Sequence, residues 1–169
     1  SSAPTASKRR VEWTYDYQGR RIRQTTSDGS SGSYVVTEDL KMLYDGWRCI
    51  AELNYSDNAL VRSYVWGLDL SGSMEGAGGV GGLLMMNSVT NGVHFYAYDG
   101  NGNVSALVSA ADGSVSGRYD YDPFGGLLRS TGWMAGENRY QFSTKRNDRT
   151  TDLELYEYRV RRTDLAWLS

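Results

Sequence analysis

The stretch Tyr119–Leu128 reads Tyr-Asp-Tyr-Asp-Pro-Phe-Gly-Gly-Leu-Leu, and it predicts a β-hairpin. Tyr119 and Tyr121 alternate as the side chains of a strand with one half-buried face do. The proline fixes φ at the start of a turn, a glycine allows the positive φ that closes it, and the leucines resume an apolar strand. Because no set of catalytic residues stands out as strongly, the function has to be inferred from hairpins of this kind.

The same phrase recurs along the chain in looser form. Residues 15–22, 98–104 and 121–127 share Tyr-Asp, two further residues, a glycine and then an aliphatic residue. An aromatic residue precedes each of these tyrosines by two positions, and a degenerate fourth copy begins at Tyr44. We expect the aspartate to cap the turn through backbone amides and the glycine to close it. The residues of this structural motif are Tyr15, Asp16, Gly19, Tyr44, Asp45, Gly46, Tyr98, Asp99, Gly102, Tyr121, Asp122, Pro123 and Gly125.

The composition favours an all-β fold of repeated antiparallel hairpins that form a ribbon or part of a shell. The 169 residues include 13 Tyr, 5 Trp and 20 Gly but only 2 Pro. Tyrosine and tryptophan favour strands and glycine favours turns, whereas long segments of helical periodicity are hard to find. Strands are predicted at residues 33–37, 51–55, 60–66, 104–108 and 114–121, and a single alternating strand is predicted at 153–160.

A glycine-rich run from Gly72 to Gly82 interrupts the hairpins. It cannot bury enough apolar surface to order itself, so we expect a mobile or tightly draped loop. The resulting organisation is a tail at 1–10, a hairpin block at 11–70, the loop at 71–82 and a second block at 83–169, as one continuous β unit. The run lacks the Gly-Lys-Ser/Thr ending of a phosphate-binding loop, which argues against nucleotide binding.

Charge and cysteine content narrow the function classes further. The formal net charge of −2 gives no reason to expect a nucleic-acid partner, and the basic clusters at 8–10 and 20–23 fit solvated edge strands. The single cysteine, Cys49, excludes an intrachain disulfide and is expected to be an inert buried thiol. No membrane span is predicted, since the longest apolar run, Leu83–Met86, is far too short, and no targeting signal defines a localisation.

The stretch Asp99–Asn103 places oxygen-bearing side chains at alternate positions, as a calcium loop would. An EF-hand requires glycine at its sixth position and glutamate at its twelfth, where this chain has Val104 and Ala110. A plain Asx turn is therefore the preferred interpretation. The sequence predicts no metal site and no cofactor.

Two further groups of residues could carry catalysis. Asp120 and Asp122 lie two apart on a predicted strand, so they could form an acid/base pair on one face. One solvated acid and one turn cap is the preferred interpretation. His94 is the only histidine and lies in no Gly-x-Ser-x-Gly elbow, so an ordinary structural histidine is preferred over a triad. We predict that the chain is not an enzyme.

Several phrases of the sequence resemble the Rhs or YD-repeat proteins. They are the Tyr-Asp motifs, Tyr64–Leu70 leading into the glycine-rich loop, the run Tyr96–Leu107, the Tyr-Asp-Pro-Phe-Gly phrase, and Arg139–Lys145 through Leu155–Arg159. The order of these motifs is similar to the Rhs repeat-associated core, over nearly the whole chain after the first ten residues. This resemblance implies a ribbon of hairpins that winds into a hollow shell around a toxic polypeptide, as in bacterial Rhs and Tc-type toxins and in teneurins. It also implies a secreted or cell-surface setting, or toxin delivery.

The chain departs from the family pattern near its end. The family usually has Thr-Gly-Leu where this chain has Thr151-Asp152-Leu153, and a phrase ending in Gly-Arg-Trp where this chain has residues 159–167. The self-cleaving aspartate site of the family would follow Ser169, so we expect neither autoproteolysis nor a toxin within this polypeptide.

The preferred hypothesis is a structural, encapsulating segment of an Rhs-type toxin shell that is non-enzymatic in isolation. The alternative is a cell-surface module that binds carbohydrate or protein through aromatic sheet faces. The expected partners of the chain are other YD-repeat segments or a second copy of itself, a toxin cargo, or a glycan. Since tyrosine rows also serve as the core of a ribbon, we prefer the structural hypothesis.

Overall fold

The computed structural model describes residues 4–162. Residues 1–3 of the predicted tail lie outside the described part, as do residues 163–169, which contain the end of the departing phrase from 163 to 167. The strands are β1 (Arg9–Tyr15), β2 (Arg21–Asp28), β3 (Val35–Asp45), β4 (Arg48–Asn54), β5 (Leu60–Trp66), β6 (Leu83–Ser88), β7 (Gly92–Tyr98), β8 (Val104–Ser109), β9 (Val115–Tyr121), β10 (Leu127–Thr131), β11 (Arg146–Asp148), β12 (Leu153–Leu155) and β13 (Val160–Arg162). Two short 3-10 helices, η1 (Thr5–Ser7) and η2 (Phe142–Thr144), complete the described elements.

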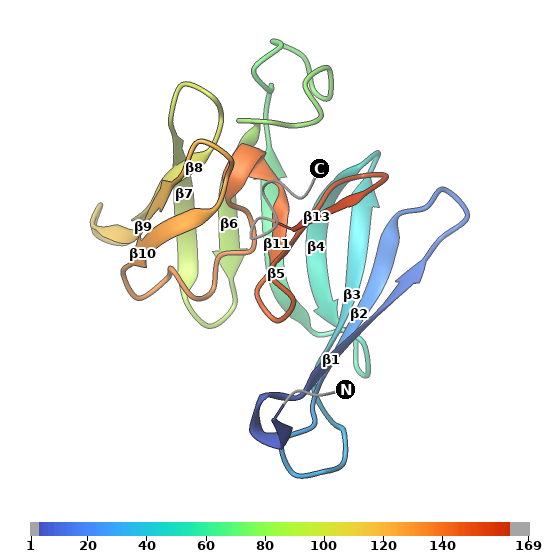
Figure 1. Cartoon of the computed structure of the whole chain (residues 1–169). Helices are drawn as coiled ribbons and strands as arrows, with labels where there is room; N and C mark the ends of the chain where they lie inside the picture. Colours follow the sequence, from blue (N-terminus) through green and yellow to red (C-terminus); the bar gives the residue numbers. More distant parts are fainter. Residues whose placement is uncertain (1–3, 163–169) are drawn as a thin grey trace.

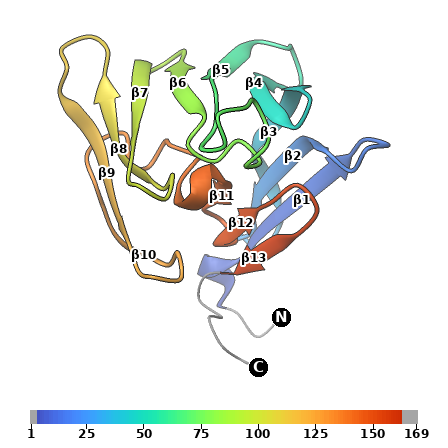
Figure 2. The same ribbon diagram turned by 90° about the horizontal axis from the view of Figure 1, so that it is seen from above.

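Strands β1 to β10 form one antiparallel sheet in which spatial order equals sequence order. Each strand therefore pairs with its neighbour in the chain, as expected for consecutive hairpins. Viewed from above, the sheet bends into an arc, and the small sheet of β11–β12–β13 lies in its hollow (Figures 1 and 2). The predicted all-β fold of antiparallel hairpins is confirmed.

The core lies between the concave face of the arc and the chain that follows β10. On β5 the side chains of Arg62 and Tyr64 are buried, whereas Val65 is exposed, which is the period-2 alternation of a strand with one covered face. The buried apolar residues that form the core cluster are Met42, Cys49, Tyr64, Leu83, Met86, Val104, Leu107, Tyr119, Met134, Ala135 and Tyr140. Three of these follow β10, so the core needs residues from outside the large sheet.

The Tyr-Asp turns share one hydrogen-bonding scheme. One carboxylate oxygen of Asp122 accepts hydrogen bonds from the amides of Phe124 and Gly126, each at 2.8 Å. Asp16 and Asp99 accept bonds from the amides two and four residues further on in the same way. Gly19, Gly102 and Gly125 take φ of +82°, +75° and +87°, the left-handed region in which glycine is unstrained. The aspartate and the glycine thus define one turn, used three times.

The degenerate copy folds differently. Asp45 and Arg48 form the last pair of the β3–β4 ladder around Gly46, which has φ of +60°. The Asp45 carboxylate is two-thirds exposed and contacts the Arg48 guanidinium at 2.6 Å instead of turn amides. This turn is shorter than the other three and does not depend on an aspartate cap.

Three of the four motif tyrosines bond to the preceding strand through their hydroxyl groups. Tyr121 donates a hydrogen bond to the carbonyl oxygen of Val104 at 2.9 Å, and Tyr98 donates one to Leu83 at 2.5 Å. In the degenerate copy, Tyr44 donates to Arg21 at 2.9 Å. Each acceptor is the first residue of the preceding strand. Tyrosine at these positions therefore fixes where the neighbouring strand begins, which phenylalanine could not do.

The prediction of a single strand at residues 153–160 is wrong, because the chain forms β12 and β13 as the two arms of a short hairpin.

The glycine-rich loop is draped around the carboxylate of Asp69, which accepts hydrogen bonds from the amides of Ser71, Ala77 and Gly79. The hydrogen bond from the Ser71 hydroxyl, together with these amide bonds, lowers the pKa of Asp69 to about 2.

Candidate functional site

After β10, residues 132–162 turn back and lie along the concave face of the large sheet, and we call them the inward segment (Figure 2). This segment supplies Met134, Ala135 and Tyr140 to the core. Tyr140 lies edge-on to the rings of Tyr64 and Trp66, with centroids 5.1 and 5.5 Å apart. The site with the most buried polar chemistry lies where this segment meets β4 and β5.

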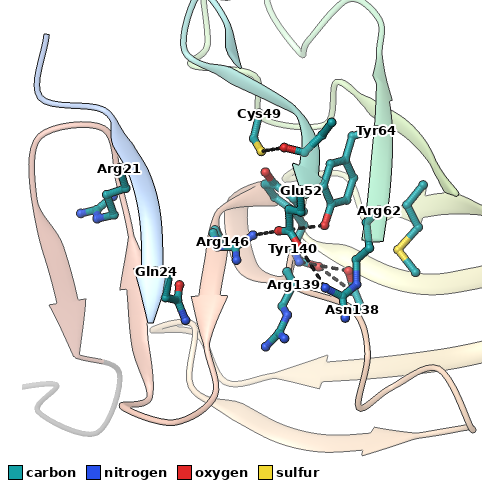
Figure 3. A network of polar contacts seen from close by, with 12 residues as sticks. Arg21, Gln24, Cys49, Glu52, Arg62, Tyr64, Asn138, Arg139, Tyr140 and Arg146 are labelled. Atoms are coloured by element: carbon teal, nitrogen blue, oxygen red, sulfur yellow. Dashed lines mark hydrogen bonds and ion pairs between the residues drawn. The ribbon is translucent and has the colours of Figure 1, made fainter. Parts of the chain in front are cut away.

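Glu52 on β4 is the centre of that site, and its side chain is fully buried. One of its oxygens accepts hydrogen bonds from Arg146 on β11 and from the hydroxyl of Tyr64, the latter at 3.2 Å. The other oxygen accepts a bond from Arg62 on β5 at 2.8 Å. Figure 3 shows these side chains converging from the sheet and from the inward segment.

The pKa of Glu52 indicates whether this carboxylate could act in catalysis or has a structural role. Burial by itself raises the pKa of Glu52, but the guanidinium groups of Arg146 and Arg62 outweigh burial and bring the pKa to about 2. A general acid or base that works near neutral pH needs a pKa close to that pH. Glu52 therefore remains ionised, and it acts as an ionic anchor for the inward segment.

Further polar contacts attach the segment to neighbouring strands. Arg139 pairs with Glu38 on β3 at 2.8 Å, and the hydroxyl of Tyr96 on β7 donates a hydrogen bond to Asn138 at 2.9 Å. Glu137 pairs with Arg62 at 3.1 Å, beside the Glu52 anchor. Strands β3, β4, β5 and β7 are thus joined by one continuous stretch of the inward segment.

A strained turn lies within the same segment. Thr144 has φ of +53°, which is unusual for a β-branched residue. Its hydroxyl donates to the carbonyl oxygen of Gly102 and accepts from the amide of Gly81, each at 2.8 Å. Strain of this kind persists only where the surroundings hold it. Thr144 thereby ties the glycine-rich loop to the Tyr-Asp turn that contains Gly102.

A cavity of about 320 Å³ lies beside the anchor, between β2–β5, the glycine-rich loop and the inward segment. Its lining combines aromatic rings, such as Trp47 and Trp66, with cationic side chains, such as Arg21 and Lys145. Tyr158 is 82% exposed and lies edge-on to Trp47, so this pair stands at the surface end of the cavity. Cys49 also lines it, and burial raises the pKa of that thiol to about 12, which keeps it protonated and unreactive.

The residues weighed for catalysis are not brought together. His94 is buried, and its two ring nitrogens contact the hydroxyl of Ser116 at 2.9 Å and the carbonyl oxygen of Asn91 at 3.0 Å. Asp120 pairs with Arg129 at 2.7 Å, while Asp122 caps its turn. Each group is occupied by a structural partner.

The stretch considered for calcium forms a turn. One oxygen of Asp99 accepts bonds from the amides of Asn101 and Asn103, and the other accepts a bond from the Asn103 side-chain amide. Within residues 4–162, no three His, Cys, Asp or Glu side chains are grouped so that they could hold a metal ion. No helix of this part of the chain is long and apolar enough to cross a membrane.

The tyrosines considered as a binding face divide between two environments. Tyr96, Tyr98 and Tyr121 pack against the core cluster, whereas Tyr17 and Tyr158 are largely exposed. The rows near the Tyr-Asp turns of the second half thus contribute to the interior. Carbohydrate binding through rows of exposed tyrosines therefore has no support from this arrangement.

The anchor itself was not predicted from the sequence. Glu52 lies in an alternating stretch that fits a half-exposed strand, and Arg146 is 94 positions away along the chain. A carboxylate flanked by apolar residues in a strand was the one available signal, and it does not specify a distant partner.

Comparison with known proteins supports the fold and a remote relationship. No protein-family model matches the chain. A curated relative, the "tRNA3(Ser)-specific nuclease WapA" of Bacillus spizizenii, is 24% identical over 142 residues, which are 83% of this chain and 5% of WapA. The crystal structure of TcdB2-TccC3 aligns with 90% of this chain and 7% of its own, with a TM-score of 0.59 and 14% identity. The resemblance to Rhs and YD-repeat proteins is confirmed as a distant one.

Two other Tc toxin structures show the same similarity of fold. TcdB2-TccC3-Cdc42 aligns with 96% of this chain at a TM-score of 0.61, and the Photorhabdus luminescens Tc holotoxin pore aligns with 90% at 0.54. Their identities of 14% and 15% establish similarity of fold alone. The chain spans less than a tenth of each of these proteins, since it covers 8% and 7% of them.

Proposed function

We propose that the chain is a structural segment of an Rhs-type β-shell and has no catalytic activity of its own. The observation that carries this proposal is the open ten-stranded sheet, in which β1 and β10 have a neighbouring strand on one side only. Such edges offer unpaired N–H and C=O groups to further strands. A shell wall is extended in this way, because each added hairpin repeats the same pairing.

The inward segment supports the same proposal. It lies on the concave face and is fixed by the buried Glu52–Arg146 pair and by the Arg139–Glu38 pair. In a wall, these contacts would hold several strands at a constant curvature. The partners of the chain would be other YD-repeat strands or a second copy, and the enclosed space would hold a cargo polypeptide.

The edges can be tested by sedimentation velocity over a wide range of protein concentration. We expect the unmodified chain to associate as concentration rises, because strands pair at open edges. The double variant Thr14→Lys on β1 with Leu128→Lys on β10 should abolish association, since charged side chains block edge pairing. Val89→Lys, in the exposed turn after β6, is the matched control and should associate like the unmodified chain. A chain that stays monomeric throughout would contradict the proposal.

The absence of catalysis is tested separately. WapA carries the name of a tRNA-specific nuclease, so tRNA is the informative substrate for this chain. We expect tRNA incubated with the purified chain to stay intact, because His94 is buried and Asp120 and Asp122 have structural partners. Cleavage that copurifies with the chain and is lost in His94→Gln would overturn this part of the proposal.

A further inference from the structure

We propose that the cavity beside the Glu52 anchor binds one carboxylate group attached to an aromatic or apolar body, with Arg21 as the residue that recognises the charge. This inference is independent of the shell proposal. It depends on the balance of charge in the cavity lining, on one guanidinium without a carboxylate partner and on the aromatic rings of the same lining.

The lining of the cavity contains more cationic side chains than carboxylates. Its cationic side chains are Arg20, Arg21, Arg48, Lys145 and Arg146. The carboxylates of the lining are those of Glu75 and Glu157. Both are already neutralised, because Glu75 lies 3.2 Å from Arg48 and Glu157 lies 2.6 Å from Lys145.

Among these cations, Arg21 differs from the others. Arg20 pairs with Asp16, and Arg146 pairs with Glu52. Arg21 forms no ion pair with any carboxylate in the described part of the chain. One of its terminal nitrogens donates to the carbonyl oxygen of Tyr156 at 2.9 Å, and its guanidinium carbon lies 5.6 Å from the centre of the Tyr15 ring. Figure 3 shows Arg21 on β2, separate from the ionic network around Glu52.

A guanidinium on the cavity lining without a carboxylate partner defines the chemistry of the missing partner. Guanidinium groups bind carboxylates through two parallel N–H···O bonds, which are stronger than bonds between neutral groups. One such group can balance one negative charge. The ligand is therefore a monoanion, and a carboxylate fits the planar donor set.

The aromatic residues of the cavity lining indicate which apolar group accompanies the carboxylate of the ligand. Trp47, Trp66 and Tyr140 present aromatic surface, and Tyr158 stands beside Trp47 at the surface end. A volume of about 320 Å³ is at the lower limit of small-molecule sites, which measure about 300–1,000 Å³. An aromatic monocarboxylate of the size of an acylated amino acid matches both the rings and the volume. The same chemistry is offered by a free small acid and by the carboxyl-terminal residue of a peptide.

The test compares a carboxylate with its neutral counterpart on the full chain. The probes are N-acetyl-phenylalanine, N-acetyl-phenylalaninamide and a pentapeptide that ends in phenylalanine with a free carboxylate. Binding is followed through the NMR signals of the Trp47 and Trp66 indole N–H groups. We expect the acid or the peptide to shift both signals, and the amide to bind at least tenfold more weakly. Binding of the peptide alone would assign the ligand to a polypeptide, and binding of both would leave the cavity open to free acids.

Variants of Arg21 test the role of the charge. Arg21→Gln should weaken binding of the acid at least tenfold, whereas Arg21→Lys, which keeps the charge, should stay within about threefold of the unmodified chain. Arg129→Gln, on β10 at the far end of the sheet, should leave binding unchanged. Equal affinity for acid and amide, no shift with any probe, or full binding by Arg21→Gln would overturn the proposal. If Arg21→Gln does not fold, the comparison of acid and amide still decides.

Discussion

Replacing Glu52 by glutamine tests whether charge holds the inward segment on the sheet. Glutamine has almost the same size and can still accept the hydrogen bond from Tyr64, but it removes the negative charge between two arginines. Arg62 would keep Glu137 as a partner at 3.1 Å. Arg146 would lose the one carboxylate that pairs with it among the described residues.

The expected loss of stability follows from the unpaired charge of Arg146 in the interior. Removing one partner of a buried ion pair costs about 3–5 kcal/mol. The pKa of Glu52 gives a similar figure, since a fall from 4.5 to about 2 corresponds to about 3 kcal/mol of interaction with the ionised form. For a domain of this size, such a loss lowers the melting temperature by about 6–20 °C. This contribution is fully present above pH 4.5 and is lost as the pH falls towards 2.

Urea unfolding followed by circular dichroism gives the free energy of unfolding for each variant. Glu137→Gln is the matched control, because this carboxylate also pairs with Arg62 but is 46% exposed, and it should cost less than about 1 kcal/mol. The double variant Glu52→Leu with Arg146→Met should be more stable than Glu52→Gln. It replaces both charged partners by apolar side chains, so no unpaired charge remains in the interior at position 146. The reasoning is refuted if Glu52→Gln costs no more than Glu137→Gln.

Three further predictions concern the small sheet and the repeated turns. Burial raises the pKa of Glu154 to about 7 against the opposing effect of Arg161, so its contribution to stability is full below pH 4.5 and is lost as the pH rises through 7. Glu154→Gln should therefore raise the free energy of unfolding at pH 8 by about 2–3 kcal/mol and leave it unchanged at pH 4, as measured by urea unfolding at both values. Tyr121→Phe should cost about 1 kcal/mol in the same assay, because it removes the bond to the preceding strand, whereas Tyr17→Phe, at a ring that is 91% exposed, should cost nothing measurable. Asp122→Ala should cost about 1–2 kcal/mol by removing two bonds to turn amides, and Asp45→Ala less than about 1 kcal/mol; equal losses would show that the aspartate cap is unimportant.

The repeated hairpins could be predicted because their information is local. A turn such as the one at Asp122 and Gly125 is specified within five residues, and strand alternation is visible over six or seven. The strand predicted at 60–66 matches β5, and the strands predicted at 104–108 and 114–121 overlap β8 and β9. Since consecutive hairpins pair in order, the large sheet follows once the turns are recognised.

The inward segment could not be predicted because its information is not local. Residues 153–160 alternate as a strand does, yet they form a hairpin, with Tyr156 donating its amide hydrogen bond to Arg159 at the turn between β12 and β13. Asp152 before this hairpin has φ of +54°, the conformation that glycine adopts most easily. The glycine that the family usually has at this position fits that backbone, so the departure at Asp152 retains the conformation at some cost in strain.

Two kinds of contact therefore stabilise this fold, and they act over different distances along the chain. Tyr44, Tyr98 and Tyr121 bond to the preceding strand, and the aspartates of the three longer turns cap those turns, so these residues specify pairing and register but not how far the sheet bends. The contacts of Glu52 and Glu38 with the inward segment reach across the concave face, from residues that lie outside the motifs. A chain with the motifs but without these ion pairs should form the same strand order around a less firmly held interior. The motif would thus specify a sheet, and the buried ion pairs would determine whether that sheet holds the shape of a shell.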